Sequence, residues 1–197
     1  MTKAIVDWNL SIPEGWLAWV RGGSNPLDGP LSKVPEFADG DEAQARVRAS
    51  VESTEAVAAE LEGWITLRGI WVPDRSTGQP VATLTMEQMA EPTGTVVSVE
   101  SFMPYVRKAP RVRGVKVVHY DVAAADTNAG PAVIATYTLL NKRSGEAIIG
   151  VDWTILPEGA HEFMKVQVTT PYSAMADAMG EQSAILANNL TVTLGDL

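Results

Sequence analysis

Apolar and polar residues alternate strictly along the first part of the chain, in the stretch VDWNLSI that starts at Val6. Successive side chains of a β-strand point to opposite faces, so this alternation predicts a half-buried strand with Val6, Trp8 and Leu10 on its inner face. Pro13-Glu14-Gly15 then has the composition of a tight turn. It leads into a second apolar stretch, Trp16–Val20, and the two strands are expected to form a hairpin.

The letters of this first stretch recur later in the chain, as VDWTILPEG at 151–159. The residues that follow the two copies, WLAWVRGG and AHEFMKVQV, do not match. A duplicated domain would keep its similarity over tens of residues. We therefore interpret the recurrence as one local structure used twice, a strand with an inward tryptophan that is closed by a Pro-Glu-Gly turn.

Three segments have the periodicity of helices. From Asp41, apolar residues recur at intervals of three and four over about 22 residues, which predicts a long amphipathic helix. A shorter helix is expected over 98–108, with Pro104 inside it. Thr170-Pro171 predicts the start of a last helix that ends near Asn189, and the tail after it is expected to be loosely held.

Further alternating stretches predict six more strands. They are Trp64–Pro73, Pro80–Met89, Val115–Val122, Ala132–Leu140, Ala147–Leu156 and Glu162–Thr169. Residues 21–40 have neither period and are predicted to form a structureless Gly/Pro-rich loop. The elements together predict an α+β fold, an antiparallel β-sheet flanked by helices in an α/β/α sandwich.

The composition is that of a globular protein with a real core, at 197 residues, 46% hydrophobic and 20% charged. This length suits a single domain over 1–197. No apolar run approaches the roughly 20 residues of a membrane span, and the N-terminal residues do not resemble a secretory leader. We therefore expect no contact with a membrane, and because cysteine is absent we expect a reducing, cytoplasmic environment.

Charge bears on the partners of the protein. The net charge of −9 opposes phosphate backbones, which argues against general nucleic-acid binding. One stretch departs from this balance, RKAPRVRGVK, which contains Arg107, Lys108, Arg111, Arg113 and Lys116. Two interpretations stay open, a solvated connection between two elements and a patch that binds an anion or an acidic partner.

Two short motifs, within this order of elements, indicate a family. They are Ile12-Pro13-Glu14-Gly15-Trp16 near the start and Phe163–Pro171, FMKVQVTTP, near the end. The chain resembles the PsbP-like (Mog/PsbP-like) fold family, including small actinobacterial proteins of this type. The resemblance implies a single antiparallel sheet flanked by helices. It also implies protein partners, because members of the family bind photosystem subunits, a small GTPase or secreted effectors; it implies no catalytic residues.

Catalytic and metal-binding motifs are not recognisable. The two histidines, His119 and His161, lack the spacing of a zinc site, and no serine lies in a nucleophile elbow. Asp121 and Asp152 are candidates for an acid–base pair, but solvent-facing alternation on neighbouring strands explains them better. We therefore expect no enzyme activity, no metal and no cofactor.

Six tryptophans are many for this length. Trp16 and Trp19 fall on opposite faces of one strand and Trp71 precedes a turn, so at least one of these is expected to be an exposed anchor for a partner. The leading hypothesis is a non-catalytic cytoplasmic adaptor or chaperone linked to secretion, which binds another protein through these tryptophans and Arg107, Lys108, Arg111 and Arg113. A homodimer through the same aromatic strand is a further hypothesis.

The alternative is a protein of another class, a small-ligand-binding protein or an unrecognised hydrolase. It would use a cleft between the sheet and a helix, near Trp71, Tyr105, His119 and Tyr137.

Overall fold

The computed structural model describes residues 2–20, 26–60 and 65–196. The chain divides into two compact units, a smaller one over 12–87 and a larger one made of 1–11 and 88–197. Both units combine antiparallel strands with helices, which confirms the predicted α+β class. The division into units leaves the single domain over 1–197 a prediction.

In the smaller unit, three antiparallel strands pair in the order β2-β3-β4. Its strands are β2 (Trp16–Val20), β3 (Ile65–Trp71) and β4 (Ala82–Ala90), the last of which continues into the larger unit. The β3–β4 hairpin was predicted with nearly these bounds, and Trp64 lies outside the described residues. β2 pairs with β3, Trp16 opposite Trp71.

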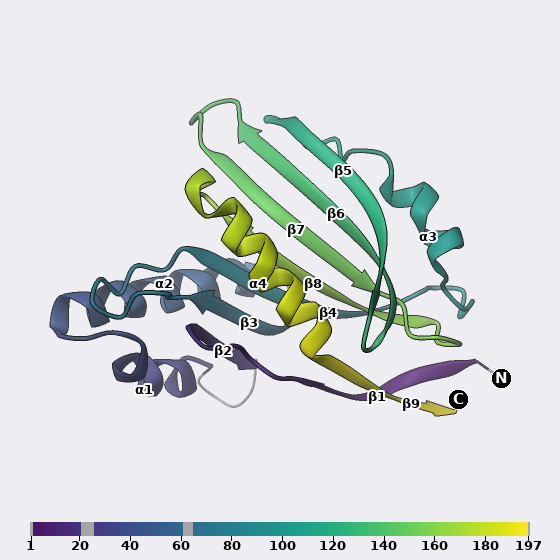
Figure 1. Ribbon diagram of the computed structural model, residues 1–197, viewed down its shortest axis with the longest axis horizontal. Helices are drawn as coiled ribbons and strands as arrows, with labels where there is room; N and C mark the ends of the chain where they lie inside the picture. The colour runs from purple at the N-terminus through teal and green to yellow at the C-terminus, as the bar shows by residue number, and fades with distance from the viewer. Residues whose placement is uncertain (1, 21–25, 61–64, 197) are drawn as a thin grey trace. The chain divides into compact units, whose positions relative to one another are not determined.

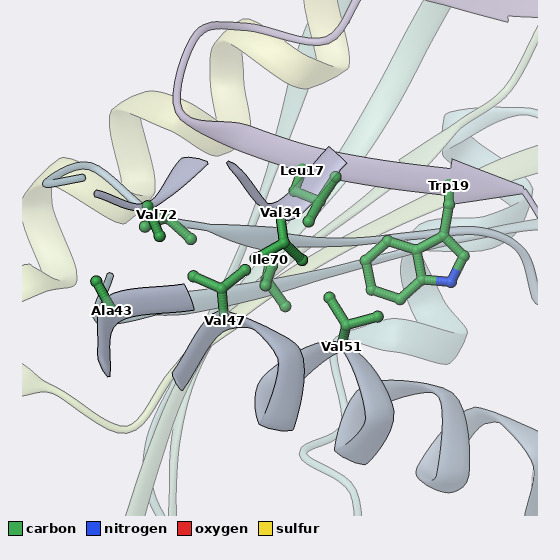
Figure 2. Packing of buried hydrophobic residues seen from close by; sticks show 9 residues of the cluster. Leu17, Trp19, Val34, Ala43, Val47, Val51, Ile70 and Val72 are labelled. Carbon is green, nitrogen blue, oxygen red and sulfur yellow. The ribbon is translucent and has the colours of Figure 1, made fainter. Parts of the chain in front are cut away.

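The long predicted helix is confirmed as α2 (Asp41–Glu60). Its apolar stripe packs on this sheet, because Val47 and Val51 are fully buried in one cluster with Ile70 of β3. Figure 2 shows these side chains pointing toward one another between the helix and the strands. The shallow stripe of alanine and valine lets the helix lie close to the sheet.

The prediction of a structureless loop over 21–40 is wrong for half of its length. Residues 28–37 form the helix α1 (Asp28–Phe37), and residues 21–25 lie outside the described residues. Pro30 falls in the first turn, where a backbone N–H has no partner within the helix, so it costs no hydrogen bond. Pro35 lies further along the helix and removes one backbone hydrogen bond from it, and burial of the neighbouring Val34 in the core offsets that loss.

In the larger unit, four antiparallel strands pair in the order β8-β7-β6-β5, and the unit also contains two helices and a separate pair of strands (Figure 1). Its elements are β1 (Lys3–Leu10), α3 (Val99–Val106), β5 (Val115–Thr127), β6 (Gly130–Asn141), β7 (Ala147–Ile155), β8 (Glu162–Thr170), α4 (Ala176–Asn189) and β9 (Leu190–Asp196). The last helix ends where it was predicted to end, but it starts later, since Ser173–Met175 form a 3₁₀ turn before it.

The two helices of the larger unit pack on opposite faces of this sheet. On one face, Phe102 of α3 contacts Phe163 of β8, with ring centroids 5.6 Å apart. On the other face, the Trp153 indole of β7 donates a hydrogen bond to Ser183 Oγ of α4, at 3.1 Å. Trp153 is opposite Val166 of β8, so these two residues share a face of the sheet. Val166 and Phe163 are three residues apart in β8 and therefore point to opposite faces. Helix, sheet and helix thus form the predicted sandwich within this unit.

The predicted N-terminal hairpin is wrong, because β1 pairs with β9 and not with β2. The tail that was expected to be loosely held therefore forms a strand. A β-bulge between Ile5 and Asp7 also changes the phase of the alternation, so that Ile5 and Leu10 are buried while Val6 is 63% exposed. One extra residue in a strand reverses the face of every residue before it.

A second bulge lies in β5, between Val117 and His119. Val118 at the bulge is exposed, and the face that holds Val117 continues with Tyr120. The predicted eight-residue link over 123–130 is also wrong, because β5 and β6 run on to a tight turn with Thr127 opposite Gly130. Three consecutive alanines, residues with low strand propensity, concealed this extension.

Candidate functional site

A pocket of about 400 Å³ lies in the larger unit, on the face of the sheet where α3 packs. This volume is within the roughly 300–1,000 Å³ that is usual for small-molecule sites. The sheet supplies a floor of aromatic and apolar side chains: Tyr120, Ala135, Tyr137 and Leu139. The end of α3 and the segment after it supply the wall, through Tyr105, Val106, Lys108 and Pro110.

Cross-strand pairing brings the floor residues together. Tyr120 of β5 is opposite Tyr137 of β6, and Ala135 is opposite Asp152 of β7. Directly opposed residues of antiparallel strands share a face, so all four side chains point to the pocket side. The sequence predicted each of these strands but not the pairing that places the residues side by side.

Gly150 makes room for one of these tyrosines. It is opposite Tyr137 in the sheet, and a Cβ atom at Gly150 would lie 2.3 Å from the Tyr137 ring. Such a distance is far below van der Waals contact, so any side chain at this position would displace the ring. Glycine thus lets the Tyr137 ring lie across β7 toward Asp152 and β8.

The polar groups of the pocket form one connected cluster. The Tyr137 hydroxyl donates a hydrogen bond to Asp152 Oδ1 at 3.0 Å. Gln167 Nε2 donates to the same Oδ1 atom and to the Tyr137 oxygen, both at 2.8 Å. Lys165 Nζ is 3.1 Å from Asp152 Oδ2. The Asp152 carboxylate is therefore engaged on both oxygens and fixes three side chains around it.

Burial and charge hold the two tyrosines in their neutral form. Burial raises the pKa of Tyr137 far above its ordinary value, and the negative charge of Asp152 raises it further. Burial also raises the pKa of Tyr120, again with a contribution from Asp152. The pocket therefore presents hydroxyl groups, not phenolates, at any physiological pH.

The wall of the pocket is tied to the floor at one point. The Tyr120 hydroxyl donates a hydrogen bond to the backbone carbonyl of Val106, the last residue of α3. At its other end α3 begins with a capping box, in which the side chains of Ser98 and Ser101 accept hydrogen bonds from each other's backbone N–H. Both ends of the short helix are thus held, and the wall is positioned before any ligand arrives.

The basic stretch follows this wall directly. Its side chains Arg107, Lys108, Arg111, Arg113 and Lys116 are exposed, as a solvated connection between α3 and β5 requires. Lys108 also lines the pocket. Of the two interpretations of this stretch, the solvated connection describes its position, and binding of an anion or acidic partner stays a prediction.

The three tryptophans that were expected to supply an exposed anchor are buried in the smaller unit. Trp16, Trp19 and Trp71 are 2%, 6% and 7% exposed, so the expectation of exposure is wrong for all three. Trp16 stacks on Trp71, with ring centroids 6.0 Å apart. A partner-binding role for these residues stays a prediction, without the exposure on which it was based.

Trp19 belongs to a buried polar group that sequence reasoning missed. Its indole donates a hydrogen bond to Glu55 Oε2 at 3.1 Å, and Arg68 Nη1 lies 2.7 Å from the same atom. Arg68 is 1% exposed, and its Nε and Nη2 atoms have no hydrogen-bond partner in the part of the chain that the structure describes. The acidic residue interrupts the apolar stripe of α2, which was the available signal.

The residues proposed from sequence for a sheet–helix cleft are only partly brought together. Tyr105 and Tyr137 line the pocket. His119 instead lies opposite Thr138, on the other face of the sheet, because of the bulge at Val118. Trp71 belongs to the smaller unit.

Two further polar assignments change with the structure. Asp121 neighbours Tyr120 along β5, so it points away from the pocket and from Asp152. Lys165 and Gln167, the polar residues of the predicted strand Glu162–Thr169, were not candidates from sequence, whereas they line the pocket. Alternation gives the two faces of a strand, but it does not show what covers the polar one.

Comparisons with known proteins give the fold some context. No family model matches the chain, and no curated protein matches its sequence. A similar solved structure is that of LpqN, described as involved in cell envelope biogenesis of Mycobacterium tuberculosis. The two are 9% identical over 97% of this chain and 90% of LpqN, with a TM-score of 0.49. A similarity at this level gives no information about function, and the PsbP-like resemblance stays a prediction.

Among the helices of the described residues, none is both long and apolar enough to span a bilayer.

Proposed function

We propose that the protein binds a small, largely apolar molecule in the pocket of the larger unit and does not transform it chemically. The observation that carries this proposal is the combination of an aromatic and apolar floor with a single hydrogen-bonded cluster of Tyr137, Asp152 and Gln167. Small-molecule sites generally have this composition, in which apolar contacts give affinity and a few fixed polar groups give orientation. This was the alternative hypothesis from sequence.

Binding without catalysis follows from how the polar groups are used. A general base needs a free lone pair within reach of the substrate, and three of the roughly four lone-pair sites of the Asp152 carboxylate already accept hydrogen bonds or an ion pair. A tyrosine nucleophile or base needs an accessible phenolate, and the pKa of Tyr137 is raised by burial. The cluster thus supports a rigid floor and offers no activated group.

The adaptor or chaperone hypothesis has less support in the geometry. Its proposed aromatic anchors are buried, while its proposed cations remain exposed. Protein binding, a link to secretion, a cytoplasmic location and a homodimer accordingly remain predictions.

A neutral fluorescent probe tests the proposal. N-phenyl-1-naphthylamine carries no charge, and its emission rises when it enters an apolar site. We expect saturable binding to the full chain, and about a tenfold or greater loss of affinity when Ala135→Phe fills the floor of the pocket. The matched control is Ala123→Phe, an exposed position on the adjacent strand that does not line the pocket.

Circular dichroism and thermal melting check that both variants are folded. Binding that is unaffected by Ala135→Phe, or weakened equally by Ala123→Phe, would show that the probe binds elsewhere and would overturn the proposal.

A further inference from the structure

We infer that the ligand of this pocket is an amphipathic anion, with an apolar tail against the floor and its negative group at the Lys108 side of the opening. This inference rests on the proposed function, and it adds the chemical class of the ligand. It starts from the uneven distribution of charge around one pocket.

The inner part of the pocket suits an apolar tail. Ala135, Leu139, Val106 and Pro110 contribute carbon atoms, and the tyrosines contribute ring faces. The one carboxylate of the lining, Asp152, is paired with Lys165 and accepts two further hydrogen bonds. Its charge is therefore compensated within the protein and does not call for a cation from the ligand.

The wall of the pocket carries positive charge that is not compensated in this way. Lys108 lines the pocket, and in the described part of the chain no carboxylate lies within ion-pair distance of its ammonium group. The same short stretch adds Arg107, Arg111 and Arg113, and no acidic residue occurs between Tyr105 and Lys116.

In a chain of net charge −9, this is a local reversal of sign at the edge of a cavity. Clustered charge of one sign beside a low-dielectric wall raises the local concentration of the opposite ion. An anionic group on the ligand would thus find Lys108 at the pocket, with further cations along the same stretch of chain, while the tail enters the pocket.

Three ligands with the same tail and different head groups test the inference: decanoate, decanol and decylamine. Calorimetric titration of the full chain at low ionic strength is expected to give decanoate about fivefold tighter binding than decanol, with decylamine weakest. The advantage of decanoate should shrink as salt is added, because exposed charges are screened.

Failure of this inference is distinguishable from failure of the proposed function. If decanol binds as tightly as decanoate, or decylamine binds more tightly, the ligand class is wrong while small-molecule binding stands. If none of the three binds, the proposed function is wrong as well.

A pair of variants locates the charge that is responsible. Lys108→Glu should abolish the preference for decanoate over decanol, because it replaces the cation of the pocket wall by a negative charge. Lys3→Glu makes the same change of charge on an exposed side chain of β1 that does not line the pocket, and it should keep the preference. Equal loss of preference in both variants would mean that only overall charge matters, which would overturn the inference.

Discussion

Tyr137 and Gly150 show how a single missing side chain shapes the pocket. The ring occupies the space where a side chain at 150 would be, and its hydroxyl thereby reaches Asp152. Sequence reasoning selected Tyr137 as a candidate, but a glycine inside a predicted strand gave no indication of what it accommodates. Only the register between β6 and β7 makes the two residues partners.

Replacing this glycine is expected to destabilise the protein. Gly150→Ala should lower the free energy of unfolding by about 1–3 kcal/mol, because the added methyl group overlaps the Tyr137 ring. The control is Gly180→Ala in the interior of α4, where a Cβ atom would meet nothing within 4 Å. There alanine should raise the free energy of unfolding by about 0.5–1 kcal/mol. Urea unfolding measures both, and a neutral effect of Gly150→Ala would contradict the steric account.

Tyr137 should also couple stability to alkaline pH. Its pKa is raised in the folded state, so the folded protein retains a proton that the unfolded chain loses near pH 10. The stabilisation from this residue is thus complete below about pH 10 and decreases as the pH rises further.

The free energy of unfolding, measured from pH 8 to 11, should therefore fall less steeply above pH 10 for Tyr137→Phe than for the wild type. An absorbance titration of the folded proteins gives an independent readout, since the substitution should remove amplitude only from the most alkaline part of the curve. Loss of amplitude near pH 10 instead would show that Tyr137 is not protected.

At the scale of elements, hydrophobic periodicity predicted which segments form strands and helices, but not always which strands pair with each other. The strands β6, β7 and β8 and the helix α2 lie close to their predicted bounds. The errors have local physical causes. Exposed valines at two bulges, Val6 and Val118, reverse the phase of alternation, and nothing in their residue type distinguishes them from core valines. Prolines at compatible positions concealed α1.

The β1–β9 pair is the least predictable of these elements, since its two strands lie at opposite ends of the sequence. Its contribution can be measured by deleting residues 191–197, which removes most of β9 but keeps the buried Leu190. The amides of β1 that bond to β9 should then lose protection from hydrogen exchange, while those of the β6–β7 pair keep it.

Unchanged protection in β1 after the deletion would show that its pairing with β9 contributes nothing to its stability. Loss of protection throughout the larger unit would show that the pair supports the whole unit rather than one strand.

At the scale of the molecule, the pocket assembles residues from four strands, the end of one helix and the segment after it, so no sequence motif contains it. The aromatic residues Tyr105 and Tyr137 were candidates from sequence, as residues near a cleft between the sheet and a helix. Asp152 was instead explained as a solvent-facing residue of an alternating strand, and Lys165 and Gln167 were not candidates. The register of β6, β7 and β8 places Tyr137 beside Asp152, Lys165 and Gln167, and the end of α3 with the segment after it adds Tyr105 to the same pocket.

The most direct test of the central claim is to map a bound ligand onto the chain. In a titration of ¹⁵N-labelled protein with decanol, followed by amide chemical shifts, the largest changes are expected in 105–110 and in the strands beside Tyr120, Tyr137 and Asp152. Saturation of these shifts along one binding curve would support a single pocket. Shifts that concentrate on α4 or in the smaller unit, or that never saturate, would contradict the account.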